Sequence, residues 1–492
     1  MSCLCAQWLW LLISFLVMGA SVSAEFYRGQ SVTWSNFSHI RQITASVSHV
    51  YFLTTRGIII YDKEQDVWKD PFTNHEGLDD WDIQRIWVDN FGDKLFVATS
   101  TDLLEYDMLI DKWFEAFGTP DLDKHERHIP PPSIMYAPAG FHYDGGTGHL
   151  VDSWARFFQF VDVLDDGSGE LWIGAWDFGV LTAGSISHRL ELLPFGLLQD
   201  RVNTIYQDDG VLWVSGAITS DSRSGLTRFD LDGLEFSYVE SGVRPEFPGD
   251  DVNCLTGDDD HIYIGTPLGL HILDRQTERV SRSFSTIDGL NSGNVLSILA
   301  FGDTLFVGTA EGLAMIMLDG DSSQVVRPTQ FANAIVYDLE LVNGSIWIAS
   351  SIGFYRIKLG TGEIQRYIDP DHVLFGDGYD IEVYDQYLWF LADGGLVQLD
   401  TKTAESRSYQ SVTERLTAND LAVNDTIAVV GTNNGFTILF HANNPPYTRD
   451  FTTADGLPSN YIYSVVLDCD YLWLGSDKGL TRFLWNNPER VD

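Results

Sequence analysis

Basic residues are scarce in this 492-residue chain, which has 30 Lys and Arg against 70 Asp and Glu and a formal net charge of −40. The electric field of so negative a protein repels nucleic acids and anionic membrane surfaces, and it favours solubility and cationic partners. The simplest interpretation is a solvated acidic surface suited to extracellular conditions. We therefore expect no nucleic-acid partner.

Cysteine is also rare, with four in the chain. Cys3 and Cys5 lie in the N-terminal apolar segment, so Cys254 and Cys469 are the pair that an oxidising compartment could join. No Cys directly follows the apolar segment, so nothing supports a lipoprotein.

The apolar run at the N-terminus, Trp8 to Ala20, is short for a membrane span. Small residues, Val22-Ser23-Ala24, follow it and are typical of a signal-peptide cleavage site before Glu25. The segment lacks the usual Lys or Arg at its start, and a membrane anchor is the alternative. We predict a signal peptide over residues 1–24 and a mature chain over 25–492, in the periplasm or outside the cell, without stable membrane insertion.

Catalytic signatures are missing as well. No GxSxG elbow, phosphate loop or dinucleotide fingerprint stands in a strand-to-helix context. His125, His128, His142 and His149 lie in one long excursion, but without the spacing of a zinc motif. Acidic turns such as Asp165-Asp166-Gly167 resemble only fragments of a calcium loop and are expected to be structural turns. We expect no enzyme, no metal site and no cofactor.

What the chain has is an internal repeat. Most copies are an apolar run with a central aromatic residue, a small residue, and a Gly about six positions after the aromatic, which together predict a two-strand hairpin. Two copies are degenerate, with Asp102 after Phe96 and with Val429 in the aromatic place, and a longer insertion separates Trp213 from Gly225. Ten copies follow one another at intervals of mostly about 40 to 50 residues. Their central positions are Tyr51, Phe96, Trp172, Trp213, Tyr263, Phe306, Trp347, Trp389, Val429 and Trp473.

A short strand precedes each hairpin and a more polar strand follows it, so each copy predicts a four-stranded β-propeller blade. The last copy lacks a fourth strand, whereas Ser31 to Phe37 form a spare strand at the mature N-terminus. We predict an all-β propeller of ten blades in one ring, closed by this N-terminal strand; two smaller propellers are the alternative. In one ring of ten, Cys254 and Cys469 stand on opposite sides and form two free, mostly buried thiols.

The copies resemble the two-component regulator propeller repeat of bacteria. The matching motifs include Leu171-Trp172-Ile173-Gly174 and Leu472-Trp473-Leu474-Gly475-Ser476, with blade linkers such as Ala454-Asp455-Gly456-Leu457-Pro458. The resemblance implies an extracytoplasmic, sensor-type propeller, and some members of that family respond to glycans. This chain ends at Asp492 without a kinase or transmembrane part, so we expect a stand-alone binding propeller.

The innermost strands share a polar position that we expect to line the central channel, either attracting cations or forming a solvated wall. Its members are Arg85, Asp162, Thr204, Cys254, Ser297, Asp338, Asp380, Asp420 and Ser464.

Repeat length breaks at a long insertion, 118–157, at an enlarged turn from Ala217 to Ser224, and at Val243 to Gly249. In a propeller these segments would meet on the top face over blades two to five, where aromatic rings stack on sugars and Arg binds carboxylates. Insertion drift in tolerant surface loops is the alternative explanation. The predicted ligand-binding residues are Trp154, Arg156, Trp176, Phe178, Arg223, Arg244 and Phe247.

We thus expect a secreted or periplasmic, monomeric, non-catalytic propeller that recognises a glycan or a protein. The alternatives are a structural or envelope-assembly scaffold for protein partners and, third, a propeller-type carbohydrate-active enzyme.

Overall fold

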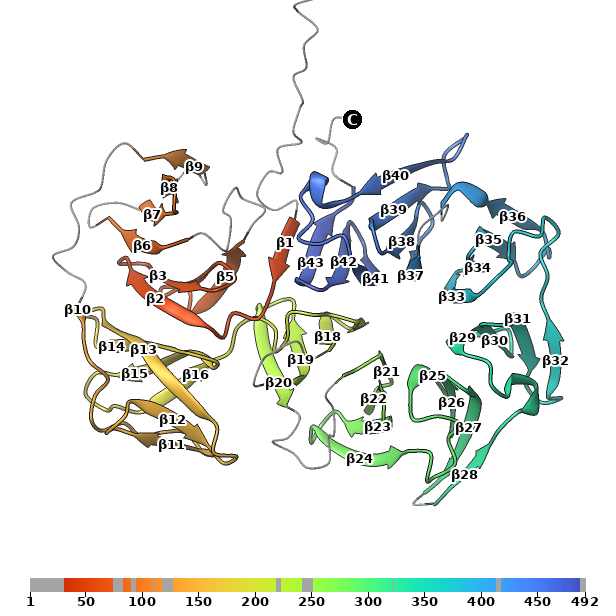
Figure 1. Ribbon diagram of the computed structural model, residues 1–492, viewed down its shortest axis with the longest axis horizontal. Helices are drawn as coiled ribbons and strands as arrows, with labels where there is room; N and C mark the ends of the chain where they lie inside the picture. Colours follow the sequence, from red (N-terminus) through yellow and green to blue (C-terminus); the bar gives the residue numbers. More distant parts are fainter. Residues whose placement is uncertain are drawn as a thin grey trace, which may run out of the picture.

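The computed structural model describes residues 31–73, 83–89, 94–108, 110, 112–116, 127–217, 223–240, 251–320, 322–412 and 417–486. These residues form ten antiparallel sheets, which we number in chain order (Figure 1). Apart from strands they contain three short 3₁₀ turns, η2 (Thr329–Phe331), η3 (Gln410–Val412) and η4 (Thr453–Asp455). The all-β fold and the ten repeats are confirmed.

Seven of the sheets form a closed ring (Figure 1). Sheet 4 contains β17 (Thr204–Asp208), β18 (Val211–Ser215), β19 (Gly225–Asp230) and β20 (Glu235–Glu240). Sheet 5 contains β21 (Cys254–Gly257), β22 (His261–Thr266), β23 (Gly269–Asp274) and β24 (Arg279–Phe284). Sheet 6 contains β25 (Val295–Phe301), β26 (Thr304–Thr309), β27 (Gly312–Asp319) and β28 (Ser322–Val326). Sheet 7 contains β29 (Val336–Val342), β30 (Ser345–Ser350), β31 (Gly353–Lys358) and β32 (Glu363–Arg366). Sheet 8 contains β33 (Gly378–Tyr384), β34 (Tyr387–Ala392), β35 (Gly395–Asp400) and β36 (Ser406–Tyr409). Sheet 9 contains β37 (Ala418–Val423), β38 (Ala428–Thr432), β39 (Gly435–Phe440) and β40 (Tyr447–Phe451). Sheet 10 contains β41 (Ile462–Asp468), β42 (Tyr471–Ser476), β43 (Gly479–Leu484) and β1 (Ser31–Trp34).

The other three sheets form an open arc beside the ring (Figure 1). Sheet 1 contains β2 (Ile40–Ala45), β3 (His49–Thr54), β4 (Ile58–Asp62) and β5 (Val67–Phe72), and sheet 2 contains β6 (Arg85–Val88), β7 (Lys94–Ala98), β8 (Leu103–Asp107) and β9 (Lys112–Glu115). Sheet 3 contains β10 (Arg127–His128), β11 (Phe141–Asp144), β12 (His149–Asp152), β13 (Phe157–Asp165), β14 (Glu170–Ala175), β15 (Gly179–Gly184) and β16 (Leu190–Leu193).

The N-terminal strand completes sheet 10, the last blade, as predicted. β1 pairs with β43 from Ser31 opposite Phe483 to Trp34 opposite Leu480. Gly479, at φ 131°, turns the chain into β43, and a Cβ there would lie 2.2 Å from the Trp34 carbonyl oxygen. Only glycine therefore fits this turn beside the strand that arrives from the far end of the chain.

The ring closes between sheets 4 and 10, which corrects the prediction of one ring of ten. The Val202 N–H donates to the Ser476 carbonyl over 2.7 Å. A Cβ on Gly475 would meet the Val202 side chain at 2.7 Å, so the two sheets are in direct contact. The alternative of two smaller propellers is also only half realised, because the second assembly is an arc. Repeats of similar sequence specify blades, but not which blades become neighbours.

Within the arc, chain order and spatial order differ. Asp162 of sheet 3 accepts the Ile43 N–H of sheet 1 at 2.8 Å, and Gln42 of sheet 1 accepts the Ile86 N–H of sheet 2 at 3.1 Å. The spatial order is therefore 3, 1, 2.

The described part of the long insertion, 127–157, caps sheet 3. β10 and β12 pair with the inner edge of β13, and Tyr136 lies beside Arg189 of the outer edge. Tyr143 and Leu150 are buried against the same flank, in one apolar cluster with Ile173. In sheet 10 the corresponding flank packs on sheet 9. The insertion thus takes the place of a preceding blade, which corrects its interpretation as a top-face binding loop; residues 118–126 lie outside the described residues.

Both described cysteines are free, as predicted. Cys254 is half-buried, and burial raises the pKa of its thiol to about 12. Cys469 is exposed, which corrects the expectation of a buried thiol.

Candidate functional site

The predicted binding residues converge where the arc meets the ring, around a residue that sequence reasoning missed, Glu240. Its Oε1 accepts the Arg223 Nη2 at 2.6 Å, and its Oε2 accepts the Arg156 Nη2 at 2.9 Å. Arg156 also binds Asp152 through its Nε at 2.6 Å. Because Arg156 belongs to sheet 3 and Glu240 to sheet 4, this cluster, which we call the junction clamp, joins the two bodies.

Electrostatics explain why the clamp holds. Burial alone would raise the pKa of Glu240, but the guanidinium groups of Arg223 and Arg156 outweigh it and hold this pKa below its usual range. The Arg223 guanidinium also lies 5.1 Å from the Phe178 ring and 5.3 Å from the Tyr238 ring. The structure therefore brings Arg156, Phe178 and Arg223 together, but both cations are already paired within the protein.

Trp154 and Trp176 lie two positions before Arg156 and Phe178 in the chain and remain accessible, at 49% and 40% exposure. Trp176 lies edge-on to His39 of the arc, with ring centroids 4.9 Å apart. Arg244 and Phe247 lie outside the described residues. No signal in the sequence singles out Glu240, because acidic residues are abundant throughout the chain.

Replacing Glu240 by Gln is expected to lower the free energy of unfolding by about 2 kcal/mol, because Arg223 loses its carboxylate partner and Arg156 loses Glu240 while keeping Asp152. The effect lies below that of a fully buried pair, since the Glu240 side chain keeps 16% exposure. Urea denaturation at pH 7 measures it. Glu235→Gln, an exposed position on the same strand, is the control and should change little; equal effects of the two variants would contradict the clamp.

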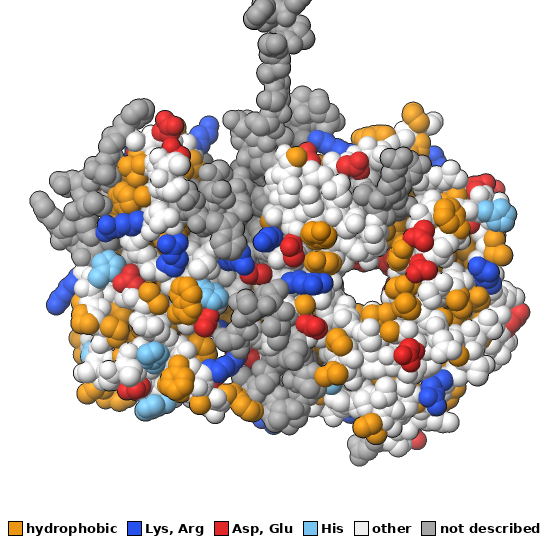
Figure 2. All heavy atoms as spheres, in the orientation of Figure 1, with side chains coloured by type: hydrophobic (Ala, Val, Ile, Leu, Met, Phe, Trp, Pro, Cys, Tyr) orange, Lys and Arg blue, Asp and Glu red, His pale blue; other side chains and the backbone are white. Residues whose placement is uncertain are grey.

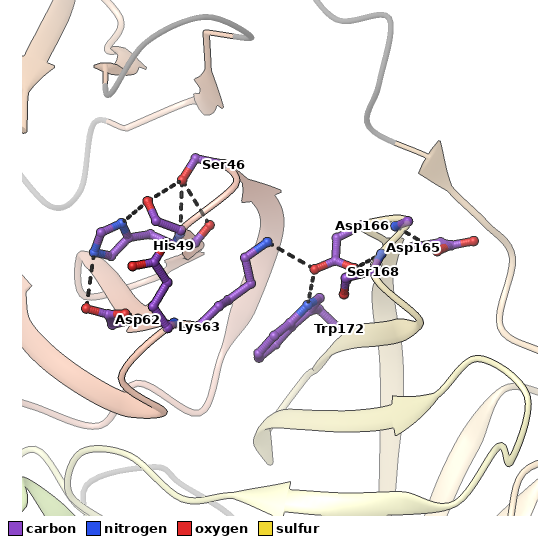
Figure 3. Close-up of polar contacts among 11 residues, drawn as sticks. Ser46, His49, Asp62, Lys63, Asp165, Asp166, Ser168 and Trp172 are labelled. Atoms are coloured by element: carbon purple, nitrogen blue, oxygen red, sulfur yellow. Dashed lines mark hydrogen bonds and ion pairs between the residues drawn. The ribbon is translucent and has the colours of Figure 1, made fainter.

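The acidic turns are structural, as predicted for Asp165-Asp166-Gly167. Figure 3 shows Asp166 between sheets 1 and 3 of the arc, where its Oδ2 binds the Lys63 Nζ at 3.1 Å and accepts the Trp172 Nε1–H at 3.1 Å. Its Oδ1 accepts the Ser168 hydroxyl at 2.6 Å. The carboxylate thus closes its own turn and joins sheets 1 and 3.

The shared polar position of the inner strands joins neighbouring sheets. Asp338, Asp380 and Asp420 accept the backbone N–H of Ile381, Leu421 and Val465 in the next sheet, at 3.1, 2.7 and 2.6 Å. Asp162 does the same in the arc. Where the side chain is shorter the contact fails, and the Ser297 hydroxyl is buried without a hydrogen-bond partner. These aspartates therefore bracket neighbouring sheets, a role that the expectation of a channel wall, cation-attracting or solvated, did not include.

Glu340 and Glu382 add two carboxyl groups to the same three inner strands of the ring, whose central opening is visible in Figure 2. Burial and the neighbouring Asp338 raise the pKa of Glu340 to about 8. Burial, with Asp420 nearby, raises the pKa of Asp338 to about 6. Burial and the adjacent acids also raise the pKa values of Asp380 and Glu382 well above normal. Glu340 therefore keeps its proton near neutral pH.

The described residues lack two further features. They contain no group of three or more His, Cys, Asp or Glu side chains placed to hold a metal ion. They also contain no helix with the length and hydropathy needed to cross a membrane.

Comparisons with known proteins identify similar solved structures. The extracellular domain of BT4673, described as a hybrid two-component system of B. thetaiotaomicron, is 14% identical with a TM-score of 0.49, over 92% of this chain and 71% of that one. PorZ, a surface component of the type-IX secretion system of Porphyromonas gingivalis, is 14% identical with a TM-score of 0.48, over 90% and 68%. Virginiamycin B lyase of Staphylococcus aureus is 13% identical with a TM-score of 0.44, over 57% and 94%.

No protein-family model matches the chain, and no curated protein sequence matches it. At identities and TM-scores this low, the similar structures say nothing of what this chain binds. The β-propeller fold rests on its own ten sheets.

Proposed function

We propose that this chain is an extracytoplasmic, non-catalytic propeller that binds a glycan or a protein through exposed aromatic side chains beside the junction clamp. The observation that carries the proposal is the group Trp154, Phe157 and Trp176, which are 49%, 67% and 40% exposed. We call this group the junction face. Aromatic rings with one open side stack on sugar rings and serve as anchors in protein interfaces.

The backbone under the junction face is well anchored. Asp152 Oδ1 accepts the N–H groups of Trp154 and Arg156, each at 2.9 Å. The Trp176 N–H donates to the Gln159 carbonyl of β13 at 2.8 Å. A surface held in one conformation loses little entropy on binding, which favours a recognition role.

A structural scaffold for envelope proteins is the second candidate. Apolar side chains are exposed elsewhere on the arc, among them Ile134 at 62%, Tyr136 at 64% and Ile186 at 97%. Figure 2 shows hydrophobic and His side chains gathered over this part of the molecule. Exposed apolar patches of this kind are typical of protein–protein contacts.

The test is a glycan array with the mature protein, residues 25–492, alongside the double variant Trp154→Ala/Trp176→Ala. We expect the double variant to lose binding at least about tenfold, which corresponds to about 1.4 kcal/mol of lost contact. Tyr461→Ala, which removes an aromatic ring of 52% exposure from sheet 10, is the matched control. Glycan binding that the double variant retains would contradict the junction face, and a blank array would favour the scaffold.

A further inference from the structure

A cleft of about 450 Å³ opens on the ring between sheets 7 and 8, in a part of the chain to which the proposed function assigns nothing. Its volume is within the range of small-molecule sites, about 300–1,000 Å³. Trp347 and Tyr367 form its aromatic side, with ring centroids 5.6 Å apart. Asp400, Thr401 and Ser406 line it from sheet 8.

The register of sheet 7 places a cation in this cleft. Trp347, Arg356 and Gln365 lie opposite one another on β30, β31 and β32. The Arg356 guanidinium is 5.7 Å from the Trp347 ring centroid, and its Nη2 donates to the Gln365 Oε1 at 2.7 Å. In the part of the chain that the structure describes, no carboxylate lies within ion-pair distance of it.

Two other blades show what usually happens to an arginine in this position. Arg228 lies opposite Trp213 and pairs with Asp230 at 3.6 Å. Arg482 lies opposite Trp473 and pairs with Asp70 at 3.0 Å. In sheet 7 the equivalent arginine lines a cleft and has no carboxylate within ion-pair distance among the described residues, although the chain carries 70 Asp and Glu. An external carboxylate would complete the pair, and a guanidinium binds carboxylates bidentately.

The remaining lining limits the ligand further. Arg366 contributes a second guanidinium, and Asp400 contributes one negative charge. The Asn343 Nδ2 lies 3.3 Å from the Thr401 Oγ1, so amide and hydroxyl groups of the two sheets meet here. Such groups can hydrogen-bond to sugar hydroxyls, and the aromatic side can stack on the apolar face of a sugar ring. The negative charge of Asp400 would repel a ligand that carried a second anionic group. We propose that this cleft binds a sugar acid, a pyranose with one carboxylate, whose carboxylate pairs with Arg356.

The test uses the mature protein with methyl glucuronide and methyl glucoside, two sugars that differ only in the carboxylate, in titration calorimetry or saturation-transfer NMR. We expect the glucuronide to bind at least about tenfold more tightly than the glucoside, and Arg356→Gln to abolish that difference. Arg228→Gln, the equivalent arginine that has an acid partner, should leave it unchanged. Thermal unfolding of both variants establishes that they fold.

Three results would overturn the assignment. These are equal binding of the two sugars, glucuronide binding that survives in Arg356→Gln, and equally tight binding of N-acetylglycine, a carboxylate without a sugar ring. The junction-face variant Trp154→Ala/Trp176→Ala should still bind the glucuronide, so that failure of this site and failure of the proposed function are separate outcomes.

Discussion

Trp34→Ala is expected to lower the free energy of unfolding by about 3–5 kcal/mol, the range for removing a large buried aromatic side chain. Trp34 is fully buried, and its ring centroid lies 5.2 Å from that of Phe229 and 5.6 Å from that of Trp473. It therefore packs on both sheets that close the ring, 4 and 10. Losing it leaves a cavity where the first strand of the chain meets the last.

Urea denaturation measures this loss, and amide hydrogen exchange in β43 gives a local readout. Exchange at Thr481 and Phe483 should accelerate, because β1 pairs with these residues. Trp154→Ala removes the same side chain from an exposed position and should cost less than about 1 kcal/mol. If the two tryptophan variants were equally stable, closure by β1 would not contribute to stability.

The second expectation concerns pH: the carboxyl groups of the channel should destabilise the protein as the pH rises. Glu340 has its pKa raised from 4.5 to about 8 by burial and by Asp338. The folded state therefore holds this proton more tightly than the unfolded state. The resulting stabilisation is fully present below about pH 4.5 and is lost as the pH rises through about 8. Asp338 contributes a second stabilisation that is lost at lower pH, as the pH rises through about 6.

Glu340→Gln removes this titration while keeping the size of the side chain. A pKa unit corresponds to about 1.4 kcal/mol, and solvent in the open channel screens part of the shift, so we expect a gain of about 2–4 kcal/mol at pH 9. At pH 4.5 the variant and the natural protein should be nearly equally stable. Groups far from Glu340 titrate in both proteins and cancel in the comparison, including Glu240, whose lowered pKa acts in the opposite direction.

Urea denaturation between pH 4.5 and 9 gives the difference in stability at each pH. Glu311→Gln, an exposed position between β26 and β27, serves as the control and should show no trend. A difference between Glu340→Gln and the natural protein that stays constant with pH would show that Glu340 is ionised throughout, contrary to the raised pKa.

The repeat made most of the local structure predictable. The aromatic-to-glycine spacing placed the second and third strands of each sheet, as at Trp473 and Gly479, because alternating apolar residues and a left-handed turn are properties of a few neighbouring residues. The lack of a fourth strand in the last repeat and the spare strand at Ser31 were visible in the sequence for the same reason. The spare strand, β1, pairs with β43 as predicted.

The candidate site was less predictable. Arg156, Phe178 and Arg223 do come together, yet their common partner Glu240 has no sequence signal, and pairing with it leaves both cations unavailable as free ligand-binding groups. The cleft between sheets 7 and 8 was not predicted from the sequence, because the position of Arg356 opposite Trp347 recurs in other blades. What distinguishes Arg356 is that no carboxylate of the described residues lies within ion-pair distance of it, and only distances in space reveal this.

By itself, the sequence determined the all-β class, the ten repeats and the strand that closes the last blade, because each depends on residue patterns within or at the ends of one repeat. Only the tertiary structure decided that seven sheets close a ring while three form an arc. It also decided that part of the insertion covers a flank as a blade would, and that the channel acids bracket neighbouring sheets. The physical reason is that blades of similar sequence present similar flanks, so their neighbours are selected by packing between residues far apart in the chain, such as Val202 on Gly475 and Tyr143 on Ile173.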